Sequence, residues 1–367
     1  MSAVVNRYLM RHFALRLAVV VFAVAAFGLL FDLIDASDDL LKRDTNAALA
    51  MFAYAGLRLP SLIREMLPLT ALLAGLFAVA DLVRHREIVV LWGSGLSSAA
   101  LALRMLPLAL LLIGLELAND ELLVPPTTEM LRDWEVGDFK QARFGADRNY
   151  VWIQSGDDVI RLDAEPAQRR ELENVVVFRR AADGTLIERI DAARGRLVDA
   201  GIELEAVVRR PVGGRKALRL ERLFWPAEVD LDAVALMARP AAELRYADLL
   251  RVVAAAGYGM RAVHAHRTWL HYRLTGSLVP ALMLILPFGF LRSFRRVGGI
   301  TPLFVKGLAT GFAFQIFGGF TLALGEGGFL APPLAAWLSP LLLLVVVTGM
   351  LVSAEMPRRR PQSAEVA

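Results

Sequence analysis

The chain has 367 residues, 56% of them hydrophobic, and a formal net charge of +4. This composition, with a mean hydropathy of +0.49, is typical of a multi-span membrane protein and argues against a soluble enzyme. The lack of cysteine in the sequence excludes disulfides, a thiol nucleophile and a thiolate metal site. The lack of a G-x-x-x-x-G-K-[ST] motif excludes a nucleotide-hydrolysing loop in this chain.

The first apolar segment follows a basic stretch. The uncharged run Leu17–Phe31 comes after several arginines and before a group of aspartates. A basic stretch before an apolar run is also the pattern of a signal peptide, but no small-x-small cleavage site follows it. We therefore predict an uncleaved first span at about residues 12–34. Residues 35–58 are predicted as a mostly polar loop and the start of the next helix.

Two more spans are predicted before residue 130. The second lies at about 60–82. The third, at about 99–121, is the weakest, because Arg104 and Glu116 leave only a short uncharged run between them. A charge at the bilayer centre costs about 2.5–3.5 kcal/mol, so both charges are expected near the ends of this span.

The stretch between the second and third spans, residues 84–97, is the most informative part of the sequence. Its first half predicts a short amphipathic helix with Ile88, Leu91 and Trp92 on one face, and glycines then break the helix. Two interpretations are open. The helix docks into a groove of a soluble partner, or the stretch is an ordinary cytoplasmic loop whose arginines only set topology.

From about residue 130 to residue 245 the pattern changes. Short apolar runs, often alternating, are separated by turn signals such as Asp183-Gly184 and Gly213-Gly214. This pattern predicts an all-β domain of many short strands, as in a sandwich or jelly roll. Three further spans are predicted after it, at about 274–292, 302–324 and 333–354.

Clusters of basic residues determine the predicted topology. They lie at the N-terminus, at Arg84 and Arg86, at Arg292, Arg295 and Arg296, and at Arg358–Arg360. Six spans place all four clusters in the cytoplasm, as the positive-inside rule requires. The predicted fold class is therefore an α-helical membrane protein with six transmembrane helices and an inserted all-β, jelly-roll-like domain on the outer side. Both termini are predicted inside.

Titratable residues offer candidate chemistry, but each group has a simpler interpretation. His264, His266 and His271 do not share a helix face and have no suitably spaced carboxylate, so no metal site is predicted. Glu116, Asp120 and Glu121 are interpreted either as acid–base groups near the outer membrane surface or, more simply, as a solvated span end. The sequence shows no convincing active site.

The assembled layout resembles the LptF/LptG permeases, the membrane part of the bacterial lipopolysaccharide exporter. Three spans, an outer β domain and three more spans match that family. The stretch at 84–97 is similar to the motif that follows span two in the family. The stretches Val151–Ile153 and Leu244–Leu250 make the chain more similar to LptG than to LptF.

The resemblance implies a set of partners in the bacterial inner membrane. An LptF-like second permease would pair with this chain, and two copies of a cytoplasmic LptB-like ATPase would bind beneath the pair. A single-span LptC-like subunit, a periplasmic LptA-like bridge and lipopolysaccharide complete the set, with no nucleic acid. The chain itself would be no enzyme and would hold no cofactor, because ATP and Mg are bound by the ATPase.

The resemblance also implies roles for particular residues. Glu87 matches the glutamate of the family's coupling helix, and the implied ATPase-coupling set is Arg86, Glu87, Ile88, Leu91 and Trp92.

Some members of the family carry lysines at the outer end of span one that meet lipid A phosphates. Here that region holds Asp32 and Asp35, which would repel phosphate. From the residues alone, these two carboxylates are either exposed loop groups or a site for a cation or partner. The implied substrate-binding candidates are instead Lys42, Arg43 and Arg132.

The resulting domain prediction has three parts. Residues 1–129 hold three spans and the coupling helix, 130–245 the periplasmic β jelly roll, and 246–367 a connecting helix, three spans and a basic cytoplasmic tail. The alternatives are a mechanotransmitting ABC permease without a lipid path, a membrane scaffold without a transport role, and an intramembrane lipid-modifying enzyme using Glu116, Asp120 or His264.

Overall fold

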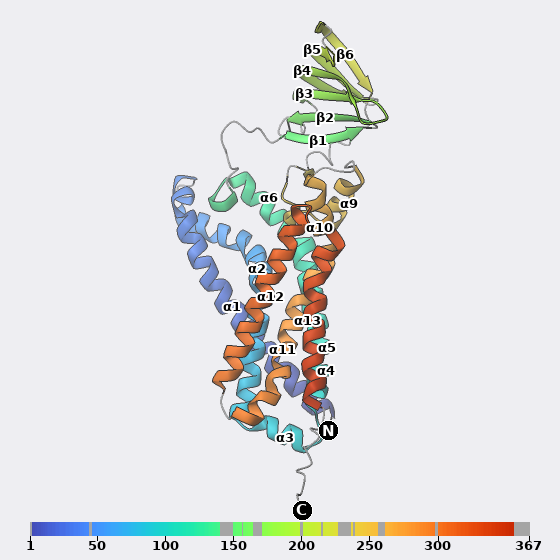
Figure 1. Ribbon diagram of the computed structural model, residues 1–367. Coiled ribbons are helices and arrows are strands. Elements are labelled where there is room, and N and C mark those ends of the chain that lie inside the picture. Colours follow the sequence, from blue (N-terminus) through green and yellow to red (C-terminus); the bar gives the residue numbers. More distant parts are fainter. Residues whose placement is uncertain are drawn as a thin grey trace, which may run out of the picture. The chain divides into compact units, whose positions relative to one another are not determined.

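The chain divides into two compact units in the computed structural model (Figure 1). Unit 1 comprises residues 1–139, 273–321 and 336–367, and unit 2 comprises residues 140–272 and 322–335. The structure describes residues 2–43, 46–139, 150–155, 157–163, 171–198, 201–213, 216–226, 236–237, 239–255, 261–297 and 300–355.

The predicted domain limits do not coincide with these two units. The limit at 129/130 falls inside helix α6 (Val124–Trp134), which belongs to unit 1. The limit at 245/246 separates helix α9 (Tyr246–Ala255) from the strands, although both belong to unit 2.

All the regular secondary structure in the described part of unit 1 is helical. The N-terminal helices are α1 (Ser2–Arg43), α2 (Ala47–Arg84), α3 (Glu87–Gly93), α4 (Ser98–Leu103), α5 (Leu106–Ala118), a π-helical turn η1 (Asn119–Leu123), α6 and a 3-10 turn η2 (Gly137–Phe139). The C-terminal helices are α11 (Leu278–Val297), α12 (Thr301–Glu326), whose last residues belong to unit 2, and α13 (Pro332–Glu355).

The polar loop predicted within residues 35–58 is wrong, because α1 continues to Arg43 and α2 begins at Ala47, whereas the expected start of the next helix in this range is confirmed. Asn46 begins α2 by accepting a hydrogen bond from the Leu49 backbone nitrogen at 3.3 Å. The segment that follows is rich in alanine and leucine, which favour helix. Both helices also have an apolar cluster to pack into. Its members are Ala36, Leu40, Ala50, Tyr54, Leu131, Val136 and Phe139.

Four described helices are long and apolar enough to cross a membrane, namely α1, α2, α12 and α13. A fifth span results if helix α10 (Arg261–Gly276) and α11 together form one bent span. The span predicted at 99–121 is divided among α4, α5 and η1, and it breaks at Arg104 and Met105. Arg104 therefore lies at an interruption between helices and not within a continuous apolar helix.

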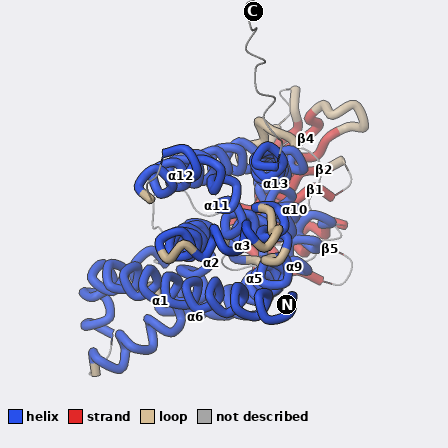
Figure 2. The backbone as a smooth tube through the Cα atoms, turned by 90° about the horizontal axis from the view of Figure 1, so that it is seen from below, coloured by secondary structure: helices blue, strands red, loops and turns tan. Residues whose placement is uncertain are grey.

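Helix α2 lies between α1 and α12 in unit 1 (Figure 2). Glycines allow the close approach of its neighbours, as is common for membrane helices. A Cβ on Gly75 of α2 would lie 2.7 Å from the backbone oxygen of Leu284 in α11. On the α12 side, a Cβ on Gly307 or Gly311 would lie within 2.6 Å of a leucine side chain of α2.

The strands of unit 2 form one six-stranded antiparallel sheet in the order β1 to β6. The strands are β1 (Tyr150–Ser155), β2 (Asp158–Asp163), β3 (Glu171–Arg180), β4 (Leu186–Val198), β5 (Gly201–Pro211) and β6 (Leu218–Pro226). The predicted inserted all-β domain is thus confirmed. Because every described strand pairs with its neighbour in sequence, the sheet is a meander and lacks the crossed strand order of a two-Greek-key jelly roll.

The sheet has one apolar face. Its buried side chains are Ile160, Leu172, Val175, Val177, Ile190, Ala192, Ile202, Leu204 and Val207. Glu188 lies on the same face as Ile190 and is almost fully buried. Its carboxylate accepts hydrogen bonds from Arg209 Nη2 at 2.7 Å and from Arg179 Nη1 at 3.2 Å. These hydrogen bonds, chiefly those from Arg209, hold the pKa of Glu188 below its usual value.

The glycine contact on α2 makes a prediction about stability. We expect Gly75→Ala to destabilise the protein by about 1–3 kcal/mol, because the backbone oxygen of Leu284 cannot move aside as a side chain can. Gly56→Ala on the same helix is the matched control, because a Cβ there meets nothing within 4 Å. Alanine is the better helix former, so this control is expected to be neutral or slightly stabilising. Thermal unfolding in detergent measures both, and equal melting temperatures would refute the expectation.

The lowered pKa of Glu188 predicts that this carboxylate stabilises the fold less at acid pH. A carboxylate whose pKa is lower in the folded than in the unfolded state stabilises the fold above the unfolded pKa, and this contribution is lost as the pH falls through the folded pKa. We expect the melting temperature of the wild type to fall more between neutral pH and pH below about 4 than that of Glu188→Gln. The control is Glu205→Gln, since Glu205 forms a more exposed ion pair, with Arg222 at 3.5 Å.

Candidate functional site

A sharp corner between α2 and α3 presents the predicted docking stretch. Helix α2 ends at Arg84, and Arg86 adopts a left-handed conformation with a φ of 57°. This conformation turns the chain into α3, which ends at Gly93. Gly95, with a φ of 88°, makes the next turn, and the Ser97 hydroxyl then caps α4 by accepting from the Ala100 nitrogen at 3.1 Å. The short helix and its glycine break therefore form as the sequence pattern indicated.

The apolar face of α3 packs against the chain's own helices. Ile88 is fully buried, and Leu91 and Trp92 are half-buried against the large apolar cluster of unit 1. The outward side chains are Val89 and Val90, which are 55% and 72% exposed. The side chains that the amphipathic pattern singled out for a partner thus anchor α3, while the two valines between them face outward. Arg86 is exposed and Glu87 half-exposed.

Three residues of α1 hold the corner from the other side. Tyr8 Oη donates a hydrogen bond to Glu87 Oε2 at 2.6 Å. Arg16 forms an ion pair with Asp81 of α2, and His12 Nε2 lies 3.6 Å from the same carboxylate. Tyr8, His12 and Arg16 follow one another at intervals of four, so they form one stripe along a helix.

Sequence reasoning missed this stripe. It treated the basic residues near the N-terminus only as signals of topology. The spacing of four was the available clue, but the partners Asp81 and Glu87 are too far away in the sequence for it to identify them.

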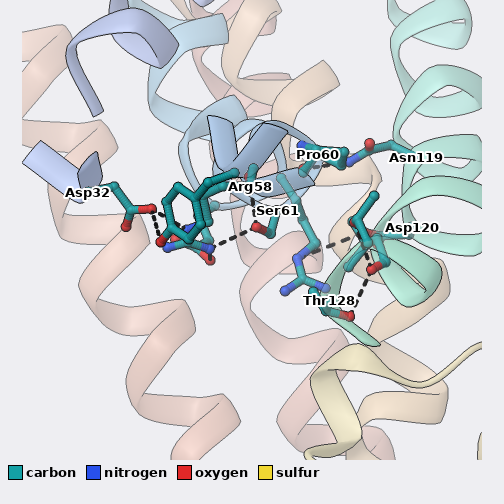
Figure 3. A network of polar contacts seen from close by, with 12 residues as sticks. Asp32, Arg58, Pro60, Ser61, Asn119, Asp120 and Thr128 are labelled. Carbon is teal, nitrogen blue, oxygen red and sulfur yellow. Dashed lines mark hydrogen bonds and ion pairs between the residues drawn. The ribbon is translucent and has the colours of Figure 1, made fainter. Parts of the chain in front are cut away.

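A second polar network joins α1 to α2 further along both helices (Figure 3). Asp32 Oδ2 accepts hydrogen bonds from Arg58 Nε at 3.0 Å and from Tyr54 Oη at 2.8 Å. Arg58 Nη1 also donates to Ser61 Oγ at 2.7 Å and to Glu65 Oε1 at 3.3 Å. Asp32 is therefore an internal ion-pair partner of Arg58, and its interpretation as an exposed loop residue is wrong.

The substrate-binding candidates lie on elements that meet in unit 1. Lys42 is exposed at the end of α1, and Arg132 is half-buried on α6. Leu40 and Leu131, close to them in sequence, belong to one apolar cluster. The side chain of Arg43 lies outside the described residues.

Buried charges meet where α5 passes into the π-helical turn η1. Asp120 Oδ2 lies 3.3 Å from Arg273 Nη1, and Asp120 Oδ1 lies 3.9 Å from Arg64 Nε. Next to it, Asn119 Nδ2 donates to the Pro60 carbonyl oxygen at 3.0 Å (Figure 3). Glu116, one turn earlier, is 5% exposed. The interpretation of Glu116 and Asp120 as a solvated span end is therefore wrong.

Two other kinds of chemistry were considered for the titratable residues, namely metal binding and catalysis by Glu116, Asp120 or His264. Within the ranges that the structure describes, no group of three or more His, Cys, Asp or Glu residues is arranged to hold a metal ion. Asp120 forms an ion pair with Arg273 and lies 3.9 Å from Arg64, so its carboxylate is engaged within unit 1. His264 belongs to unit 2, whereas Glu116 and Asp120 belong to unit 1.

Comparison with known families identifies the chain. Residues 7–352 match the family model of the lipopolysaccharide export system permease LptF/LptG, so the match includes most of both units and all of α3. The chain belongs to the LptF/LptG family. It is therefore a multi-pass permease of lipopolysaccharide export and a transmembrane subunit of an ABC transporter. The comparison with curated proteins gives no significant match.

The network around Asp32 makes a prediction about this permease. We expect Asp32→Asn to lower stability by about 1–3 kcal/mol, because Arg58 is buried and loses a charged acceptor. Asp35→Asn, one turn further along α1, changes an exposed carboxylate and is expected to leave the melting temperature unchanged. Thermal unfolding of the two purified variants makes the comparison, and an equal effect of both would contradict an internal role for Asp32.

Proposed function

We propose that this LptF/LptG permease is the LptG-like subunit of a transporter that extracts lipopolysaccharide from the outer leaflet of the bacterial inner membrane. Its partners are an LptF-like permease, two copies of an LptB-like ATPase, a single-span LptC-like subunit and a periplasmic LptA-like bridge. ATP and Mg are bound by the ATPase, and this chain contributes no catalytic group. The observation that carries the proposal is the family match together with helix α3, which is anchored on one face and exposed on the other.

Helix α3 has the properties of an ATPase-coupling helix. A helix that transmits force needs a firm attachment to the membrane helices and a free surface for the ATPase. Ile88 supplies the attachment, supported by Leu91 and Trp92. Val89 and Val90 supply an exposed apolar surface, and apolar surface left in water favours association. Arg86 and Glu87 add polar groups at the start of the helix.

The proposed membrane topology rests on the position of the basic residues. Arg84 and Arg86 are exposed at the α2–α3 corner, and Tyr8 places the first turns of α1 at the same end of unit 1. By the positive-inside rule this end is cytoplasmic. Both termini are then cytoplasmic and the sheet of unit 2 is periplasmic.

Lipid phosphates are proposed to meet Lys42, Arg43 and Arg132. The aspartates near the end of α1 would repel a phosphate at this place, because both groups are negatively charged. Asp32, however, is neutralised by Arg58, and Asp39 Oδ2 accepts from the Gly137 nitrogen at 3.2 Å. Two of these carboxylates are thus engaged inside unit 1, which reduces the repulsion that a phosphate would meet.

The test targets the exposed surface of α3. We expect Glu87→Ala and Val90→Asp to lower the amount of ATPase that co-purifies with the permease, because each removes part of the docking surface. Val212→Asp is the matched control, since Val212 is an exposed valine in unit 2. Quantitative mass spectrometry of the purified complexes gives the ratio of ATPase to permease. An unchanged ratio in both α3 variants would refute a docking role for α3.

A further inference from the structure

We propose that Tyr8 is a positioning residue that ties α3 to α1, so that a displacement of α3 by the ATPase moves α1 together with α2. This inference rests on the proposed role of α3 as the coupling helix. Without such a tie, α3 would act on α1 only indirectly, through the corner to α2 and the ion pairs that join α2 to α1.

The hydrogen bond itself is specific. Tyr8 Oη and Glu87 Oε2 are 2.6 Å apart, although 79 positions separate the two residues in sequence. A hydrogen bond to a carboxylate is shorter and stronger than one between neutral groups. Glu87 is the first residue of α3, so this bond acts at the end of the helix that adjoins the corner. A carboxylate has two acceptor oxygens, and the bond from Tyr8 uses Oε2, so Glu87 can also accept from a donor of the ATPase.

The adjoining face of α1 is packed into the bundle. Leu9 and Phe13 are fully buried in the large apolar cluster, and Phe13 stacks on Phe288 of α11 with ring centroids 5.3 Å apart. The first turns of α1 are thus held by apolar packing on one face and by Tyr8, His12 and Arg16 on the adjoining face. Hydrogen bonds are directional, so they determine which helical turn of α1 lies beside α3. Apolar packing alone does not determine this.

The two polar networks between α1 and α2 explain how motion at the corner reaches the far end of both helices. Arg16 pairs with Asp81 near the corner, and Asp32 pairs with Arg58 further along. Arg16 and Asp32 are 16 residues apart, which is about 24 Å along a helix. With both ties in place, α1 and α2 move as one body. Tyr8 attaches this body to α3.

The experiment compares transport with ATP hydrolysis in the complete complex. Tyr8→Phe removes only the hydroxyl group. We expect the ATPase to co-purify as before and to hydrolyse ATP, while the lipopolysaccharide delivered per ATP falls roughly fivefold, the factor that corresponds to one hydrogen bond. Arg11→Gln, on the same helix but outside the stripe, is the control and is expected to keep the wild-type ratio. A wild-type ratio in Tyr8→Phe would overturn the proposal.

A distance measurement gives a second, independent readout. Because the chain has no cysteine, spin labels attach only at introduced sites, here Val4→Cys on α1 and Ser94→Cys at the end of α3, both exposed. We expect the distance between the labels to stay constant through the ATP cycle, and to vary once Tyr8→Phe is added. A distance that varies in the labelled protein with Tyr8 intact would overturn the proposal, even if Tyr8→Phe failed to assemble. Failure of the proposed function would instead appear as unaltered ATPase binding in Glu87→Ala and Val90→Asp.

Discussion

A charge within an apolar helix bundle is tolerated only when an opposite charge meets it there, because an unpaired buried ion is strongly unfavourable. Unit 1 satisfies this constraint in three places, through Arg16–Asp81, Arg58–Asp32 and Arg273–Asp120. Each pair joins two different helices. Such pairs add little net stability compared with apolar packing, but a shift of one turn would leave both charges unpaired. They therefore determine which turn of one helix faces which turn of the next.

This constraint connects helix α3, the proposed coupling helix, to the rest of the permease. Helix α3 is short, and short helices are marginal by themselves, so its position depends on contacts with longer helices. Ile88 gives it an apolar anchor and Glu87 a polar one. The same carboxylate that the family resemblance assigns to the ATPase is thus already part of the polar contacts between α1, α2 and α3. Force applied to α3 would therefore enter a set of helices whose relative positions are fixed by charge.

The sequence predicted what depends on local patterns. Periodicity and glycines located α3, and alternating apolar runs with turn signals located the sheet. Hydropathy, however, marks where a helix leaves the membrane and not where it ends, so it predicts a polar loop in the first part of residues 35–58 although the described residues there are almost entirely helical. The burial of Asp120 was missed because its partner Arg273 lies 153 positions away. The pattern also showed that α3 is amphipathic, but not that its apolar face turns inward against the bundle.

The glycines described beside α2 have a consequence for how the bundle deforms. On the α1 side, α2 is held by directional charged contacts, which oppose sliding along the helix axis. On the α12 side, Leu72 and Leu76 sit over Gly307 and Gly311, and dispersion contacts of this kind depend on separation and have little directionality. The two sides of α2 therefore resist different motions. Moving α2 away from α12 loses dispersion contacts, whereas sliding α2 along α1 leaves charged side chains unpaired. Sliding of one helix along another is therefore easier between α2 and α12 than between α2 and α1.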